Sequence, residues 1–164
     1  WKVSLINTGE NTMTGGRLLR VKDYLNDETF CFTYGDGVSD INIAEVVKHH
    51  KSQKRFATIS AVQPPGRFGL LSMGDNFQVN GFKEKPQGDN SWINGGFFVL
   101  ETEIFNYLTD DSTVWEKDPL INLAKENQLT YFKHNGFWHP MDTLRDKNNL
   151  NFMWKEGNAP WKIW

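Results

Sequence analysis

The sequence predicts an α/β domain with a mixed, mostly parallel sheet and a small antiparallel insertion. Segments rich in apolar and β-branched residues alternate with segments of helical periodicity, as in sheets covered by helices. Two short strand-like segments, Leu70–Met73 and Phe77–Phe82, follow each other across the turn residues Gly74-Asp75-Asn76 and predict the antiparallel insertion. The 164 residues suffice for one domain with its own core, which we assign to residues 1–164.

The same patterns predict the other elements in chain order. Apolar and β-branched runs bounded by turn residues predict strands at Trp1–Ile6, Phe30–Tyr34, Phe56–Val62, Trp92–Leu100 and Leu129–Lys133. Apolar residues at helical spacing predict helices at about Leu18–Leu25, Asn42–Lys51, Glu103–Leu108, Pro119–Asn127 and Leu144–Glu156. The adjacent His49 and His50 close the second of these helices, and we interpret them as solvated residues rather than a metal-binding pair.

Composition narrows the classes of function. The net charge of -2 and the isoelectric point near 6.1 give no electrostatic reason to expect nucleic acid or an anionic membrane as a partner. The single cysteine, Cys31, lies in an apolar strand and has no internal disulfide partner, which predicts a reduced, cytoplasmic compartment. The seven tryptophans, among them Trp138, Trp154, Trp161 and Trp164 near the end of the sequence, favour a packed core or a subunit interface, and hence a homo-oligomer.

The stretch Phe30–Val38 contains the first candidate functional residue. Its apolar strand runs into a tight turn in which Asp36 stands between Gly35 and Gly37. Ligands of open α/β sheets bind at the carboxyl ends of the strands, and flanking glycines let the backbone approach a phosphate or a metal. Asp36 is therefore a candidate metal ligand. An aspartate that merely caps the next helix would give the same pattern.

A second isolated carboxylate, Asp142, precedes the final helix, where an N-cap role would also explain it. Two carboxylates can hold one Mg²⁺ and leave its other positions to phosphate oxygens and water. Lys85, held extended by the following Pro86, could reach a substrate phosphate as a point charge. These three residues together favour a reaction that transfers a group between phosphates.

Two glycine pairs are candidates either for ligand binding or for a purely structural role. The polar loop Glu10–Arg17 contains Gly15-Gly16 and opens a helix, so its backbone N–H groups could bind a phosphate or a base edge. A plain connection from strand to helix explains the same loop. The pair Gly95-Gly96 lies inside a strongly apolar strand, where glycines mark a bulge or a close approach by ligand or backbone.

Several motifs, in order along essentially the whole chain, resemble those of the sugar-nucleotidyltransferases. They are F-T-Y-G-D-G-V at Phe32–Val38, P-P-G-R-F-G at Pro64–Gly69, F-K-E-K-P at Phe82–Pro86, I-N-G-G-F-F-V at Ile93–Val99 and F-W-H-P-M-D-T-L-R-D at Phe137–Asp146. The segment T-M-T-G-G-R and the tail W-K-x-G-x-A-P-W-K are similar to the members that use CTP and glucose 1-phosphate. The resemblance implies a Rossmann-like nucleotidyltransferase fold.

The resemblance also implies a reaction and a role for each matching residue. A phosphate oxygen of glucose 1-phosphate would attack the α-phosphorus of CTP, giving CDP-glucose and pyrophosphate for surface polysaccharide synthesis. Catalysis would rest on alignment and charge neutralisation. The implied catalytic residues are Asp36, Lys85 and Asp142, of which the two aspartates bind Mg²⁺. The implied nucleotide-binding residues are Thr12, Thr14, Gly15, Arg17 and Gly35. The implied sugar-binding residues are Gly69, Glu84, Asn94 and Gly95.

The sequence departs from the family at its start. Members begin with a strand and a loop of the form G-G-x-G-T-R, followed by a lysine, and this chain contains neither. The resemblance therefore implies an N-terminally incomplete domain, whose strand Phe30–Tyr34 would have an uncovered edge open to self-association. An enzyme of nucleotide-sugar synthesis and a non-catalytic remnant with weak nucleotide-sugar binding both remain open. So does the base, because members that use UTP, dTTP or ATP share the layout.

Overall fold

The computed structural model describes residues 2–66, 69–84 and 91–163. The chain divides into two units. The first contains Trp1–Phe32, Ala44–Ile59 and Phe98–Tyr131; the second contains Thr33–Ile43, Ser60–Phe97 and Phe132–Trp164. No helix among the described residues is long and apolar enough to cross a membrane.

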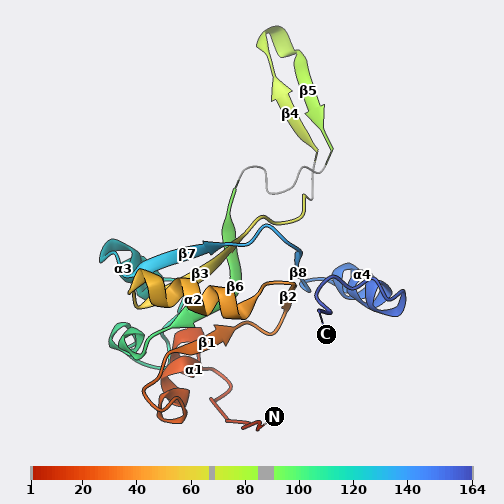
Figure 1. The fold of residues 1–164 in the computed structure, drawn as a ribbon. Helices are drawn as coiled ribbons and strands as arrows, with labels where there is room; N and C mark the ends of the chain where they lie inside the picture. The colour runs from red at the N-terminus through yellow and green to blue at the C-terminus, as the bar shows by residue number, and fades with distance from the viewer. Residues whose placement is uncertain (1, 67–68, 85–90, 164) are drawn as a thin grey trace. The chain divides into compact units, whose positions relative to one another are not determined.

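A four-stranded sheet has the order β1-β6-β3-β7 (Figure 1), with bounds Phe30–Thr33, Ile93–Leu100, Ala57–Val62 and Leu129–Lys133 in that order. The path from β1 to β3 passes through helix α2 (Ile43–Gln53) and crosses over β6, which lies between them in the sheet. Two antiparallel two-stranded sheets, β2 with β8 and β4 with β5, accompany it. The predicted α/β class and its antiparallel insertion are therefore confirmed.

Burial distinguishes the inner strands from the outer ones. The inner strands β3 and β6 are buried along most of their length, as expected of strands packed on both faces. In the outer strand β1, half-buried and exposed residues alternate, and Cys31 is exposed. Cys31 therefore lies in the strand as expected, but its side chain is exposed, because the side chains of a strand point alternately to its two faces. Partial desolvation still raises the pKa of the Cys31 thiol above its usual 9.0.

The start of the chain differs from the prediction. Residues 2–9 form no strand, and Val3 and Leu5 are 72% and 95% exposed. Helix α1 (Thr14–Val21) begins four residues earlier than expected and takes Gly15 and Gly16 into its first turn. The last residues of the predicted helix form a short 3₁₀ segment, Lys22–Tyr24. The apolar run at the start therefore predicted a strand that has no partner among the described strands.

The first unit has an aromatic core. The ring of Phe98 stacks on Phe32 with centroids 5.5 Å apart and meets Trp115 edge-on at 5.9 Å, a favourable geometry for aromatic pairs. Trp115 has no exposed surface. Residues Thr102–Tyr107, predicted as a helix, form a 3₁₀ helix, and helix α3 (Asp118–Lys125) follows.

His50 corrects another expectation. It is 1% exposed rather than solvated, with Nδ1 2.7 Å from Thr58 Oγ1 and Nε2 3.0 Å from Glu101 Oε1. Glu101 also accepts a hydrogen bond from Thr29 Oγ1 at 2.8 Å. The side chain points into a buried polar cluster because a helix directs adjacent residues to different sides.

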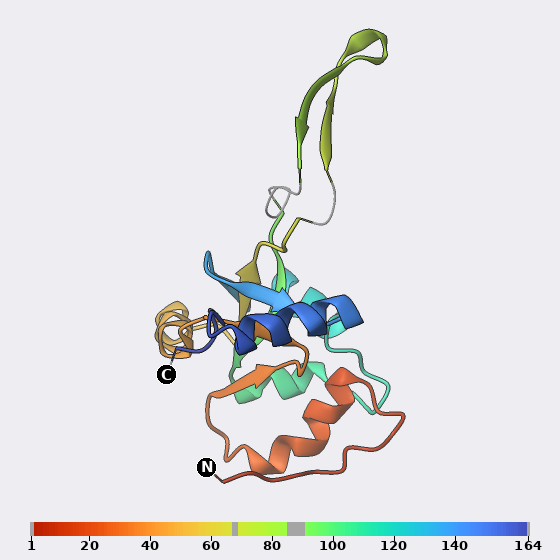
Figure 2. The same cartoon turned by 90° about the vertical axis from the view of Figure 1, so that its right-hand side faces the viewer.

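The second unit contains the small sheets and the last helix. Strands β4 (Leu70–Met73) and β5 (Val79–Lys83) form a hairpin, visible as two long antiparallel strands in Figure 2. Its turn places Asn76 at φ 55°, a conformation that asparagine tolerates. Strands β2 (Gly37–Ser39) and β8 (Trp138–Pro140) form a short ribbon, and helix α4 (Leu144–Lys155) follows. Among the C-terminal tryptophans, the Trp161 ring lies 5.4 Å from that of Phe137.

Candidate functional site

The β2–β8 ribbon brings the two candidate metal ligands to the same end of one small sheet. Its antiparallel register pairs Gly37 with Pro140. One step beyond, the Met141 N–H donates to the Asp36 carbonyl at 2.7 Å. Asp142 is the next residue, so the two aspartates are one position apart in register. The register thus brings both aspartates to the same end of the ribbon, while their one-residue offset does not by itself set the two side chains on one face, because successive residues of a strand point to opposite faces.

Helix capping explains neither aspartate. Asp36 leads into strand β2 and not into a helix. The N-cap of α4 is Thr143, whose Oγ1 accepts from the Asp146 N–H at 3.2 Å, while the Thr143 N–H donates to Asp146 Oδ2 at 3.0 Å. This is a complete capping box. The alternative given to each aspartate from the sequence is therefore wrong.

The chemistry of this end of the ribbon fits a hard divalent cation. Both aspartates are exposed. Within the described part of the chain, no group of three or more His, Cys, Asp or Glu side chains is placed to hold a metal. Mg²⁺ is often bound by only one or two carboxylates, since it keeps waters and takes substrate phosphates. A Cβ added to Gly35 would meet nothing within 4 Å, so the surface beside Asp36 is open.

A small pocket adjoins Asp36 within the second unit. Its volume is about 40 Å³, enough for a water molecule or two and not for a sugar ring. Asp36 thus shares a concave surface with Asn94 and Gly95, two of the predicted sugar-binding residues. The lining residues are Tyr34, Asp36, Gly37, Asn94, Gly95, Gly96, Trp138 and Pro140.

The Gly95-Gly96 pair shapes β6 where it borders the pocket. A Cβ on Gly95 would stand 2.7 Å from Val62 Cγ1 and 3.0 Å from the Ser60 carbonyl oxygen. Gly96 has φ +77°, the left-handed region that favours glycine. Its N–H donates to Asn94 Oδ1 at 2.8 Å, which supports this turn of the backbone. The close approach that the glycine pair predicted is made by the protein itself.

The other predicted sugar-site residues lie beside the hairpin. A Cβ on Gly69 would stand 2.5 Å from Phe82 and 3.2 Å from Glu84 Oε2, so Gly69 and Glu84 are neighbours. Glu84 is exposed. Lys85, the predicted contact to the sugar phosphate, lies outside the described residues.

In the first unit, the start of α1 is joined to the loop that precedes α3. The Met13 N–H donates to the Asp111 carbonyl at 2.8 Å, and the Gly15 and Gly16 N–H groups donate to the Thr113 carbonyl at 2.9 and 3.2 Å. These are among the N–H groups that could have bound a phosphate, one of the two readings of this loop left open by the sequence. The protein's own carbonyls occupy them.

Three of the four predicted nucleotide-site residues on this unit have structural contacts. Thr12 is 6% exposed, and Gly15 is buried with Thr113 Cγ2 only 2.8 Å from the place of a Cβ. Thr14 Oγ1 donates to Glu116 at 2.7 Å and accepts from the Trp115 N–H at 2.9 Å. The fourth, Arg17, is exposed and carries the charge that a nucleotide phosphate would attract.

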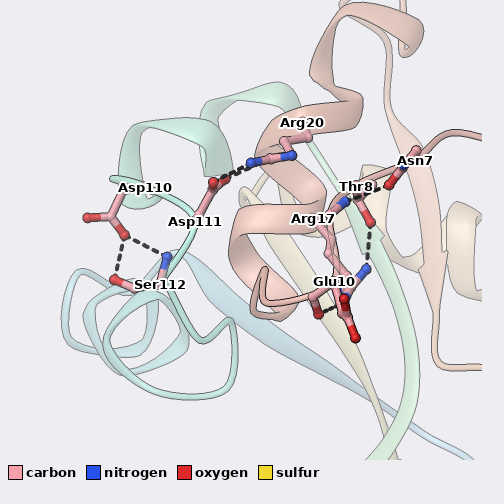
Figure 3. A network of polar contacts seen from close by, with 9 residues as sticks. Asn7, Thr8, Glu10, Arg17, Arg20, Asp110, Asp111 and Ser112 are labelled. Atoms are coloured by element: carbon pink, nitrogen blue, oxygen red, sulfur yellow. Dashed lines mark hydrogen bonds and ion pairs between the residues drawn. The ribbon is translucent and has the colours of Figure 1, made fainter.

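Figure 3 shows the polar network around Arg17 and Arg20 of α1. Arg17 Nη1 donates to Thr8 Oγ1 at 2.6 Å and Nη2 to the Glu10 carbonyl at 3.2 Å, which holds the preceding segment against α1. Arg20 binds Asp111 through both carboxylate oxygens, with Nε 2.8 Å from Oδ1. Hydrogen bonding to Arg20 and its charge lower the pKa of Asp111 below 3.8, although desolvation opposes them. The helix and the loop are therefore joined by backbone and side-chain bonds.

A model of the nucleotidyl transferase family matches residues 3–143 of this chain. The chain belongs to the nucleotidyl transferase family. It is 51% identical to the glucose-1-phosphate cytidylyltransferase of Salmonella typhimurium over the whole of this chain and 64% of that protein. It is 29% identical to the mannose-1-phosphate guanylyltransferase catalytic subunit beta of Danio rerio over 93% of this chain and 43% of that one. This member of the family thus spans less than two thirds of the length of these relatives.

Solved structures share the fold. A UDP-glucose pyrophosphorylase complexed with UDP-glucose superposes with a TM-score of 0.67 at 12% identity, over 94% of this chain and 66% of that one. HddC from Yersinia pseudotuberculosis gives a TM-score of 0.60 at 24% identity, over 85% and 61%. At these identities the likeness concerns the fold alone. It confirms the Rossmann-like nucleotidyltransferase fold that the motifs implied.

Sequence reasoning missed the residues that hold the candidate residues in place. Trp138 and Tyr34 line the pocket, and the carbonyls of Asp111 and Thr113 bind the start of α1. Trp138 belongs to the motif at Phe137–Asp146, four residues before Asp142, so its position was a usable signal. The Asp111 and Thr113 carbonyls gave no signal in the sequence, because every residue type has a backbone carbonyl.

Proposed function

We propose that this chain provides the sugar-phosphate and metal side of an enzyme that joins CTP and glucose 1-phosphate into CDP-glucose and pyrophosphate. One observation carries the proposal: the β2–β8 ribbon sets two exposed aspartates at the same end, beside a pocket lined by Asn94 and Gly95. The 51% identity to a glucose-1-phosphate cytidylyltransferase supports the choice of substrates.

The proposed reaction needs little covalent help from the protein. A phosphate oxygen of the sugar phosphate forms a bond to the α-phosphorus of CTP, and the bond from that phosphorus to the bridging oxygen of pyrophosphate breaks. Asp36 and Asp142 would hold Mg²⁺, which supplies positive charge between the phosphates. Arg17 would contact the nucleotide, while Thr12, Thr14 and Gly15 hold α1 against the loop before α3. Gly35 would let the nucleotide approach the backbone beside Asp36.

The remaining roles follow from charge and position. Lys85 would contact the phosphate of the sugar, and Gly69 and Glu84 would contact the sugar together with Asn94 and Gly95. A cytoplasmic homo-oligomer acting in surface polysaccharide synthesis completes the proposal. The single cysteine supports the cytoplasmic compartment. The exposed side chain of Trp154, 49% accessible, supports the homo-oligomer.

The test uses the whole protein that contains this chain. Pyrophosphate release is measured with Mg²⁺, glucose 1-phosphate and, in separate reactions, CTP, GTP, UTP or dTTP. We expect turnover with CTP to exceed the others by at least about a hundredfold in kcat/KM, because a site built to hydrogen-bond one base rejects the others strongly. Preference for another nucleotide would assign a different member of the family, and binding without turnover would indicate the non-catalytic remnant.

Replacing Lys85 tests its role separately. Lys85→Ala removes the point charge proposed to meet the sugar phosphate, so we expect the KM for glucose 1-phosphate to rise about tenfold or more. The KM for CTP should change little. Lys83→Ala, on the exposed end of β5, is the matched control. Equal effects of the two variants would contradict a specific role for Lys85.

A further inference from the structure

The indole of Trp138 links the ribbon to strand β6. Trp138 lies in β8, opposite Ser39 of β2. Its Nε1–H donates to the carbonyl oxygen of Gly95 at 2.8 Å. Both residues line the pocket that contains Asp36. A side chain from the element that leads to Asp142 therefore holds the backbone of the element that carries Asn94.

The backbone of β6 turns next to the Gly95 carbonyl. Gly96 has φ +77°, and the side chain of Asn94 already binds the Gly96 N–H at 2.8 Å. On the other side, Val62 and Ser60 leave no room for a Cβ on Gly95. The segment Asn94–Gly96 is thus fixed by β3 on one side and by Trp138 on the other. Removing the indole N–H would take a hydrogen-bond donor from the carbonyl of a buried residue and so loosen this turn.

We infer that Trp138 is a positioning residue for sugar-phosphate binding: through the Gly95 carbonyl it holds the Asn94–Gly96 turn beside Asp36. Trp138 needs no contact with the substrate for this. The inference rests on the proposed function, because it concerns the same pocket. Its main effect should fall on the sugar phosphate, since four of the five predicted nucleotide contacts, Thr12, Thr14, Gly15 and Arg17, belong to the other unit. Only Gly35 of that set belongs to the same unit as the pocket.

The decisive variant is Trp138→Phe in the whole protein, which keeps an aromatic ring and removes the N–H. We expect the KM for glucose 1-phosphate to rise about tenfold, the cost of one lost hydrogen bond to a buried acceptor, with the KM for CTP and kcat within about twofold. Trp115→Phe is the matched control. It removes the same atoms from a fully buried indole whose Nε1 has no hydrogen-bond partner among the described residues.

A second measurement keeps the inference separate from the proposed function. In ¹⁵N-labelled protein, the indole N–H of Trp138 should exchange slowly, and Trp138→Phe should shift the amide resonances of Gly95 and Gly96 more than Trp115→Phe does. Glucose 1-phosphate added alone should bind the wild type more tightly than Trp138→Phe. Equal affinities, or unshifted glycine resonances, would overturn the inference. A wild type that binds glucose 1-phosphate in this way without transferring a nucleotide would overturn the proposed function alone.

Discussion

At the scale of single residues, the two aspartates beside the ribbon carry the chemistry that we propose. Asp36→Asn and Asp142→Asn keep the side-chain shape and remove a charge that would hold Mg²⁺. We expect each to lower kcat/KM at least about a hundredfold and to weaken Mn²⁺ binding, measured by electron paramagnetic resonance. Asp27→Asn is the control, because Asp27 is an exposed turn residue at φ 53° that asparagine tolerates. Normal activity of either site variant would exclude that aspartate as a ligand.

The exposed arginine of α1 is the residue-scale test of the nucleotide site. Arg17→Met removes the charge and keeps most of the aliphatic length, so we expect the KM for CTP to rise about tenfold and the KM for glucose 1-phosphate to stay unchanged. The loss of the Thr8 and Glu10 contacts should cost little stability, because they are exposed. A change in both KM values together would instead indicate that the variant disturbs the fold.

At the scale of elements, the contact between α1 and the loop before α3 depends on two glycines, Gly15 and Gly16, which leave room for the loop. A Cβ on Gly16 would lie 2.6 Å from the Asp111 backbone, and one on Gly15 would lie 2.9 Å from the Thr113 carbonyl oxygen. Gly16→Ala should therefore lower the free energy of unfolding by about 1–3 kcal/mol in urea titrations, despite the better helix propensity of alanine. Gly35→Ala, whose Cβ would meet nothing within 4 Å, should leave it unchanged.

The same contact should respond to acid. The folded-state pKa of Asp111 lies below its usual 3.8, so its pairing with Arg20 stabilises the folded state above pH 3.8 and is lost as the pH falls through the lowered pKa. Asp111→Asn should therefore lose less stability than the wild type between pH 5 and pH 2. Parallel urea titrations across this range measure the difference. Identical pH profiles would show that the pair contributes nothing at the ionic strength used.

The elements also show what a sequence can predict. The strands and helices predicted from Phe30 onward agree with the structure to within a few residues, because burial on a sheet or helix face imposes its period on the residue pattern. The short strands β2 and β8 were not predicted. The segment Trp1–Ile6 has the composition of a strand, but residues 2–6 pair with no described strand, and composition alone does not show which strands will pair.

The candidate site was likewise only partly predictable from the sequence. The two carboxylates were visible in the sequence, whereas the 2.8 Å bond from Trp138 depends on a register that local patterns do not specify.

At the scale of the whole molecule, β1 ends the described sheet and exposes Cys31 and Thr33. An open strand edge presents N–H and C=O groups to other chains. We expect residues 1–164 expressed alone to self-associate in sedimentation experiments. Cys31→Lys should reduce the association, and Ser52→Lys on α2 should not. A monodisperse monomer would contradict this expectation.

The β2–β8 ribbon also bears on the order of folding. The Met141 N–H bonds the Asp36 carbonyl across more than a hundred residues of chain. Closing so long a loop carries a large entropic cost, and such pairings form after local structure is in place. A ribosome-bound chain that ends before residue 138 can contain helix α2 and the β4–β5 hairpin, but it cannot bring the two aspartates together. Metal affinity should therefore appear only after Asp142 has been synthesised and the ribbon has paired.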